Sequence, residues 1–119
     1  MKKLIYISIA VMAAALCSCE SNTYEDISDP FIINGTVTYT GYVKGIVDDK
    51  CVSCHNPGGD ASSRPLQTYD QVKDAVLNHD LLTRIQLQSG EEDLMPKTGR
   101  MSQNRINVIL QWNEDGLLE

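Results

Sequence analysis

The chain has 119 residues, of which 42% are apolar and 22% charged, so it is long enough for one small globular domain and too short for a multidomain assembly. Its 16 acidic residues outnumber its 10 basic residues, which gives a formal charge of −6. Because this balance provides no basic surface to neutralise phosphates, nucleic acid is not an expected partner.

The first 18 residues are typical of a bacterial export signal. Two lysines precede an uncharged stretch, residues 4–16, that is too short to span a bilayer comfortably. The stretch ends in Leu16-Cys17-Ser18-Cys19, which resembles the lipobox of bacterial lipoproteins, with an apolar residue three positions before the acceptor cysteine and a small residue directly before it. We therefore expect residues 1–18 to be a lipoprotein signal peptide and Cys19 to carry the lipid. An ordinary secretory signal that is cut nearby is the alternative.

Residues 19–35 are expected to form a flexible acidic tether between the lipid and the domain. The part from Glu20 to Asp29 is polar and offers little to bury, and Pro30 ends it. After removal of the signal, 8 basic residues remain against 16 acidic residues, which is a formal charge of −8. We therefore expect a domain that is lipid-anchored to a membrane of the cell envelope, in the periplasm or on the cell surface. Its negative charge should be repelled by anionic lipid.

Residues 36–119 are expected to form one domain, mostly of helices. At its start, the stretch from Phe31 to Tyr39 surrounds Asn34-Gly35 with β-branched residues and predicts a β-hairpin, although the chain offers no further strand to join it. Thr68 and Ser102 are candidate N-caps, and Gly116 is a candidate helix stop. Apolar residues at helical spacing predict helices in four stretches, Tyr42–Val47, Tyr69–Leu77, Leu81–Leu87 and Ile106–Trp112.

The pentapeptide from Cys51 to His55 has the spacing CxxCH, which in an exported protein indicates a c-type haem attachment site. Two thiols three residues apart on a tight turn can each add to a haem vinyl group, and the adjoining imidazole is then held under the iron. Two other interpretations use the same cysteines. A redox-active dithiol would be expected within a βαβ pattern, which is lacking, and a zinc site with His55 or His79 would need a further ligand motif.

A haem iron held by His55 needs a sixth ligand or an open position. Met95 lies in a loop 40 residues further along the chain, and Pro96 restricts its backbone to extended geometry. A thioether opposite an imidazole favours ferrous iron and raises the reduction potential. Met101 and His79 are alternative ligands, although Met101 precedes a helix cap as a staple residue does, and His79 lies at a polar helix end.

The chain from about Val37 to its end is similar to the short class I cytochrome c domains of bacterial exported proteins. The resemblance implies an all-α fold of three to five helices around one covalent haem c, with the first and last helices packed together. It also implies that Cys51 and Cys54 bond the haem, that His55 is the proximal iron ligand and that Met95 is the distal one. The matching segments are 37–39, 43–46, Cys51–Gly58, Met95-Pro96, and a final helix with Ile106, Ile109, Trp112 and Gly116.

These features predict a membrane-anchored monohaem cytochrome that carries single electrons and turns over no substrate of its own, so it is not expected to be an enzyme. Its acidic surface favours redox partners of the envelope with a basic docking patch. The alternative is a haem protein that binds or senses a small ligand, or has peroxidatic activity, through a labile sixth position. A thiol or non-haem metal module on the same cysteines is a third interpretation.

Overall fold

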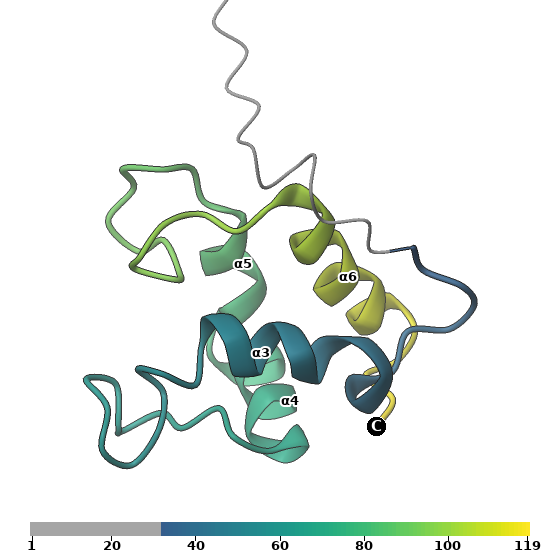
Figure 1. The fold of residues 1–119 in the computed structure, drawn as a ribbon, viewed down its shortest axis with the longest axis horizontal. Coiled ribbons are helices and arrows are strands. Elements are labelled where there is room, and N and C mark those ends of the chain that lie inside the picture. Colours follow the sequence, from purple (N-terminus) through teal and green to yellow (C-terminus); the bar gives the residue numbers. More distant parts are fainter. Residues whose placement is uncertain (1–31) are drawn as a thin grey trace, which may run out of the picture.

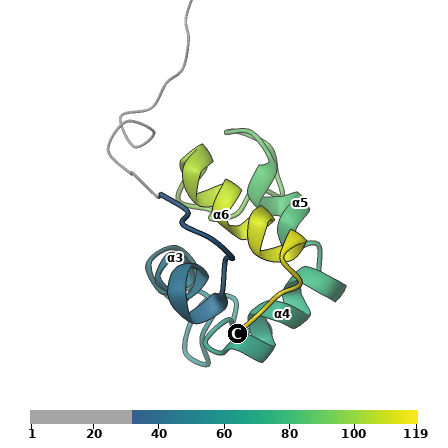
Figure 2. The ribbon, with the colours of Figure 1, turned by 90° about the vertical axis from the view of Figure 1, so that its right-hand side faces the viewer.

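Residues 32–119 are the part of the chain that the computed structural model describes, and within them the fold is all-α, as the sequence predicts. The predicted signal peptide, Cys19 and most of the predicted tether lie outside the described residues. The helical segments are the π-helix η1 (Tyr39–Val43), α3 (Lys44–Lys50), α4 (Tyr69–Asn78), α5 (Leu81–Gln86) and α6 (Gln103–Glu114). They surround a common centre (Figure 2).

The hairpin expected over residues 31–39 is wrong for the part that is described. Residues 32–38 contain no strand, and η1 begins at Tyr39. Gly35 and Thr36 do make a bend, with Gly35 at φ 87°, but a turn forms a hairpin only where two strands pair. The Asn34 amide instead donates a hydrogen bond to the Tyr42 hydroxyl, over a distance of 3.3 Å.

The predicted N-caps and the predicted helix stop are found at the residues that the sequence indicates. Thr68 forms a capping box with Gln71, in which each side chain accepts a hydrogen bond from the other residue's backbone amide. The Ser102 hydroxyl accepts from the Arg105 amide at 3.4 Å and so begins α6. That helix ends at Glu114, and Gly116 follows with a φ of 93°, which favours glycine.

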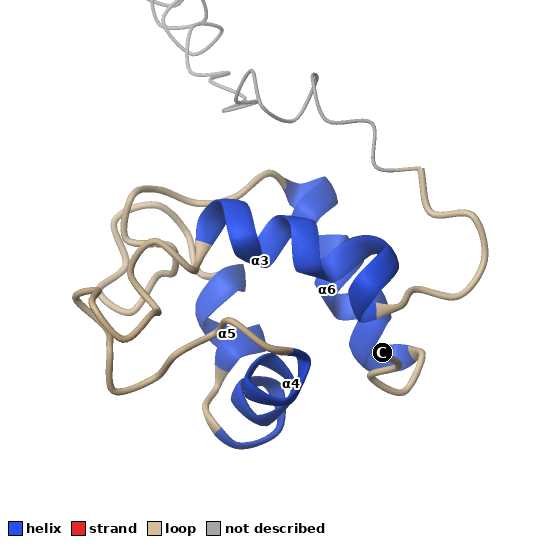
Figure 3. Cartoon of the chain, turned by 60° about the horizontal axis from the view of Figure 1, so that its bottom comes forward, coloured by secondary structure: helices blue, strands red, loops and turns tan. Residues whose placement is uncertain are grey.

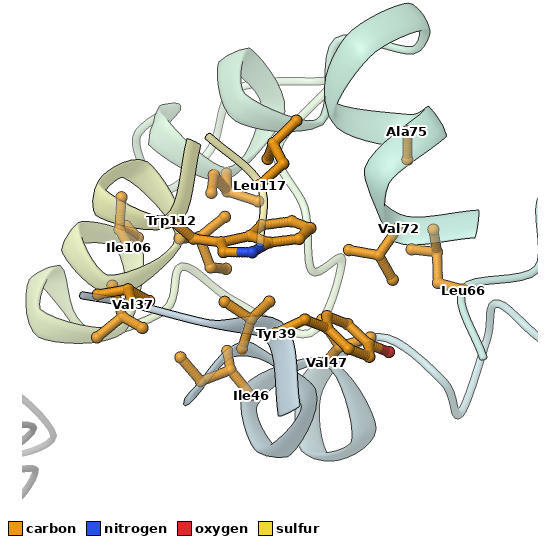
Figure 4. Packing of buried hydrophobic residues seen from close by; sticks show 14 of the residues in the cluster. Val37, Tyr39, Ile46, Val47, Leu66, Val72, Ala75, Ile106, Trp112 and Leu117 are labelled. Atoms are coloured by element: carbon orange, nitrogen blue, oxygen red, sulfur yellow. The ribbon is translucent and has the colours of Figure 1, made fainter. Parts of the chain in front are cut away.

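The core is centred on Trp112, a fully buried residue of α6 whose ring lies near those of Tyr39 and Tyr69 (Figure 4). Its ring centroid is 5.8 Å from that of Tyr39 on η1 and 6.3 Å from that of Tyr69 on α4. Aromatic pairs at this spacing stabilise beyond their buried area. Trp112 therefore joins η1, α4 and α6 into one core.

Backbone carbonyls after α6 close this core. The carbonyl oxygen of Leu118 accepts hydrogen bonds from the Tyr39 amide at 2.8 Å and from the Trp112 indole nitrogen at 2.7 Å. The carbonyl of Leu117 accepts from the Tyr69 hydroxyl at 2.7 Å. The C-terminal segment therefore connects all three aromatic residues.

Asp115 ties the start of the domain to its end. One carboxylate oxygen accepts from the Val37 amide at 2.7 Å and the other from the Gln111 side chain at 2.9 Å, and these bonds hold the pKa of Asp115 below its ordinary value of 3.8. A depressed folded-state pKa adds stability that is present above pH 3.8 and is lost as the pH falls through the folded-state pKa. We therefore expect Asp115→Asn to melt a few degrees lower than wild type at pH 7, with the difference shrinking below about pH 4.

Thermal melts of wild type, Asp115→Asn and the control Glu114→Gln, across pH 3 to 7, would check this expectation. Glu114 is the exposed neighbouring acid, so its change removes the same charge without these hydrogen bonds. A deficit of Asp115→Asn that is equally large at pH 3 and pH 7 would contradict the assignment.

Two long loops leave the helices on the same side of the domain, which Figures 1 and 3 both show. One joins α3 to α4 and begins with the CxxCH pentapeptide, and the other joins α5 to α6 and contains Met95. Residues 32–38 and the C-terminus lie on the other side. Among residues 32–119, no helix has the length and apolar character needed to cross a membrane.

Candidate functional site

The CxxCH pentapeptide continues the turn of α3 beyond the end of the helix. The amide of Cys51 donates to the Val47 carbonyl at 2.9 Å, and the amides of Cys54 and His55 donate to the Cys51 carbonyl at 3.2 and 2.9 Å. Both cysteines are free and half-buried. The turn therefore carries two unpaired thiols and an imidazole within five residues.

Burial raises the pKa of the Cys51 thiol to about 11, with Asp49 and Cys54 contributing in the same direction. At neutral pH the thiol is therefore protonated. Dithiol oxidoreductases instead depend on a cysteine whose pKa is lowered, because the thiolate is the nucleophile. The environment of Cys51 is thus unlike that of a thioredoxin-type motif.

His55 is oriented by a backbone carbonyl. Its ring Nδ1 lies 2.7 Å from the carbonyl oxygen of Arg64, and its own carbonyl accepts from the Leu66 amide at 2.9 Å. A carbonyl oxygen can only accept, so in the neutral ring Nδ1 carries the proton and Nε2 holds a free lone pair. This is the tautomer that a metal-ligating histidine with a carbonyl partner adopts.

Asn56 and Gly59 support the turn through contacts with its backbone. This role was not predicted from the sequence for either residue. The Asn56 amide nitrogen donates to the carbonyls of Val52 at 2.7 Å and Ser53 at 3.0 Å. A Cβ on Gly59 would lie 2.2 Å from the Cys54 carbonyl oxygen, so only glycine fits there. An asparagine followed by two glycines within four residues is the signal that could have indicated this local bracing.

Met95 lies within the second loop, between α5 and α6. Its amide donates to the Arg84 carbonyl on α5 at 3.2 Å, and its neighbours Leu94 and Pro96 are buried while Met95 itself is half-buried. The loop thus contacts α5 through the Met95 amide and through the ion pair between Asp93 and Arg84. Met95 and the 51–55 turn belong to the two loops that leave the helices on one side of the domain (Figure 1).

The other two ligand candidates lie in different surroundings. Met101 is 3% exposed and belongs to the hydrophobic core next to the Ser102 cap. His79 is exposed at the end of α4, and its Nε2 is 3.1 Å from a carboxylate oxygen of Asp74. These surroundings favour a packing role for Met101 and a surface contact with Asp74 for His79.

No group of three or more histidine, cysteine, aspartate or glutamate side chains that could hold a metal ion comes together within residues 32–119. A structural zinc site needs four such ligands. In the described part of the chain, the two cysteines therefore lack the companions that a zinc site requires.

Comparison of the chain with protein-family models, with curated proteins and with solved structures finds no match. The functional conclusion therefore depends on the chemistry of the residues described above.

Proposed function

We propose that this protein is a membrane-anchored monohaem c-type cytochrome that carries single electrons in the cell envelope. The observation that carries the proposal is the orientation of His55, whose Nδ1 is bound by the Arg64 carbonyl and whose Nε2 is left free. This imidazole directly follows two unpaired thiols on one turn. Such a donor set fits a haem that is covalently attached and ligated from the same pentapeptide.

Each residue of the turn has a distinct role in this proposal. The thiols of Cys51 and Cys54 would bond the haem covalently through its two vinyl groups. His55 Nε2 and the Met95 sulfur would ligate the iron. When bound, haem iron cycles between ferrous and ferric states and so carries one electron at a time.

The location and the partners are part of the same proposal. Residues 32–38 enter the domain on the side away from the two loops (Figure 3). A mature formal charge of −8 favours redox partners with a basic docking patch, whose association slows as salt rises.

The test is a visible spectrum of the oxidised and reduced protein, expressed with a haem-maturation system, for wild type, Met95→Ala and Met101→Leu. We expect wild type to contain covalent low-spin haem with the weak far-red band of sulfur–iron ligation. Met95→Ala should lose that band and lower the reduction potential by on the order of 100 mV, since axial ligands set haem potentials over a range of about 0.8 V. Met101→Leu is the matched control and should keep both.

Contrary results separate the other interpretations. A high-spin spectrum, or one that Met95→Ala leaves unchanged, would exclude Met95 as the ligand and favour a haem protein with a labile sixth position. A mature protein without covalent haem would overturn the cytochrome proposal, and the cysteines would then form a thiol or metal module.

A further inference from the structure

The loop that contains Met95, residues 87–102, has no helix or strand and is held internally by short turns and two side-chain hydrogen bonds, Gln88 to Glu91 and Lys97 to Glu92. Its backbone hydrogen bonds are short turns, such as Leu94 to Glu91 at 3.3 Å and Gly99 to Pro96 at 3.2 Å. Most of its side chains are exposed, and it surrounds a hollow of about 260 Å³ next to Leu94. Packed side chains are few in the loop and include the neighbours of Met95, Leu94 and Pro96, so contacts at its ends also matter for where Met95 lies.

Contacts between the loop and α5 are also few. The Met95 amide bonds to the Arg84 carbonyl, and the Arg84 guanidinium pairs with Asp93 at 3.2 Å. The Asp93 side chain is 68% exposed, and exposed ion pairs of this kind contribute little because solvent screens them. The hydrogen bond from the Met95 amide is then the direct polar contact of that residue with α5.

The two ends of the loop are joined by the side chain of Arg100. Its Nε donates to the Leu87 carbonyl at 3.1 Å, directly after α5. One terminal nitrogen lies 2.7 Å from the Gln103 side-chain oxygen at the start of α6, and the other lies 3.4 Å from the Met101 carbonyl. A planar guanidinium can make these bonds in three directions at once, which a lysine ammonium on its flexible stem cannot reproduce.

We propose that Arg100 is a positioning residue for Met95, because its guanidinium closes the neck of the 87–102 loop and so holds the methionine against α5. The inference rests on the proposed function in that Met95 is taken as the iron ligand. Loop closure at a neck restricts every residue between the joined ends, so a side chain that touches neither Met95 nor the haem can control how often the sulfur leaves the iron.

The first experiment measures hydrogen exchange of the amides in residues 88–99 of the full mature chain, with or without haem. We expect Arg100→Gln to raise exchange in this loop about tenfold, because hydrogen bonds from a charged donor are lost. Arg105→Gln is the matched control, since it removes a charge and a 2.6 Å ion pair with Asp49 outside the loop. Equal loop exchange in wild type and Arg100→Gln would overturn the proposal.

The second experiment measures how fast imidazole displaces the sulfur ligand in the haem-loaded protein, followed by the far-red band. We expect displacement to be about tenfold faster than wild type in Arg100→Gln. Arg100→Lys should be as fast as Arg100→Gln, because lysine keeps the charge but not the planar guanidinium. Displacement at the wild-type rate in Arg100→Lys would show a charge effect and overturn the positioning role.

The two experiments distinguish failure of this inference from failure of the proposed function. A wild-type chain without haem would remove the cytochrome proposal and the ligand role of Met95, while the exchange experiment would still decide whether Arg100 closes the loop. A haem-loaded wild type with a sulfur ligand and no effect of Arg100→Gln would remove this inference alone.

Discussion

Replacing Gly59 by alanine is expected to dismantle the turn that carries Cys51, Cys54 and His55. The new Cβ would lie 2.2 Å from the Cys54 carbonyl oxygen and 2.7 Å from its carbon, and both are backbone atoms that no rotamer change can move. The hydrogen bond from Ala61 to that same carbonyl, 3.0 Å long, would be lost as the backbone shifts. Overpacking a tight site costs about 1–3 kcal/mol.

We expect Gly59→Ala to lower the melting temperature and to reduce the share of chains with covalent haem by tenfold or more, because misplaced thiols no longer share one turn. Gly58→Ala is the control. Its Cβ would meet the Asn56 side-chain oxygen at 3.6 Å, which is ordinary contact. Melting curves and the mass of the purified chains measure the two effects, and equal behaviour of both variants would refute this role of Gly59.

Truncating Trp112 to alanine is expected to be the most destabilising single change in the core. Trp112 is fully buried, contacts Tyr39 and Tyr69, and donates to the Leu118 carbonyl at 2.7 Å. Removal of a buried tryptophan costs about 3–5 kcal/mol, and the carbonyl of Leu118 would lose one of its two partners. Small domains have only about 5–15 kcal/mol of total stability.

We therefore expect the melting temperature of Trp112→Ala to fall by more than about 10 °C, since each 1 kcal/mol shifts a domain of this size by about 4–8 °C. Leu77→Ala serves as the control. Leu77 is 60% exposed on α4, so its truncation should change stability by less than about 0.5 kcal/mol. Chemical denaturation followed by circular dichroism measures both, and a Trp112→Ala midpoint close to wild type would contradict the central place of this residue.

The features that the sequence predicts correctly are local ones. The capping box of Thr68, the cap of Ser102 and the stop at Gly116 each depend on residues within a few positions, so their side chains identify them without knowledge of the fold. The CxxCH spacing is local as well, and it places Cys51, Cys54 and His55 on one turn. The hairpin expected around Asn34-Gly35 is wrong for the described residues because a strand exists only with a partner, and residues 32–119 contain no strand.

The contacts that only the tertiary structure decided are mostly hydrogen bonds to backbone carbonyls. The Arg64 carbonyl selects the tautomer of His55, the Leu118 carbonyl joins Tyr39 to Trp112, and the Leu87 carbonyl receives Arg100. Every residue has such an oxygen, so no pattern of side chains reveals which one will be used. The sequence by itself determined the helices and the donor set of the candidate site. The orientation of its imidazole and the support of its methionine loop depend on contacts that form only once the chain has folded.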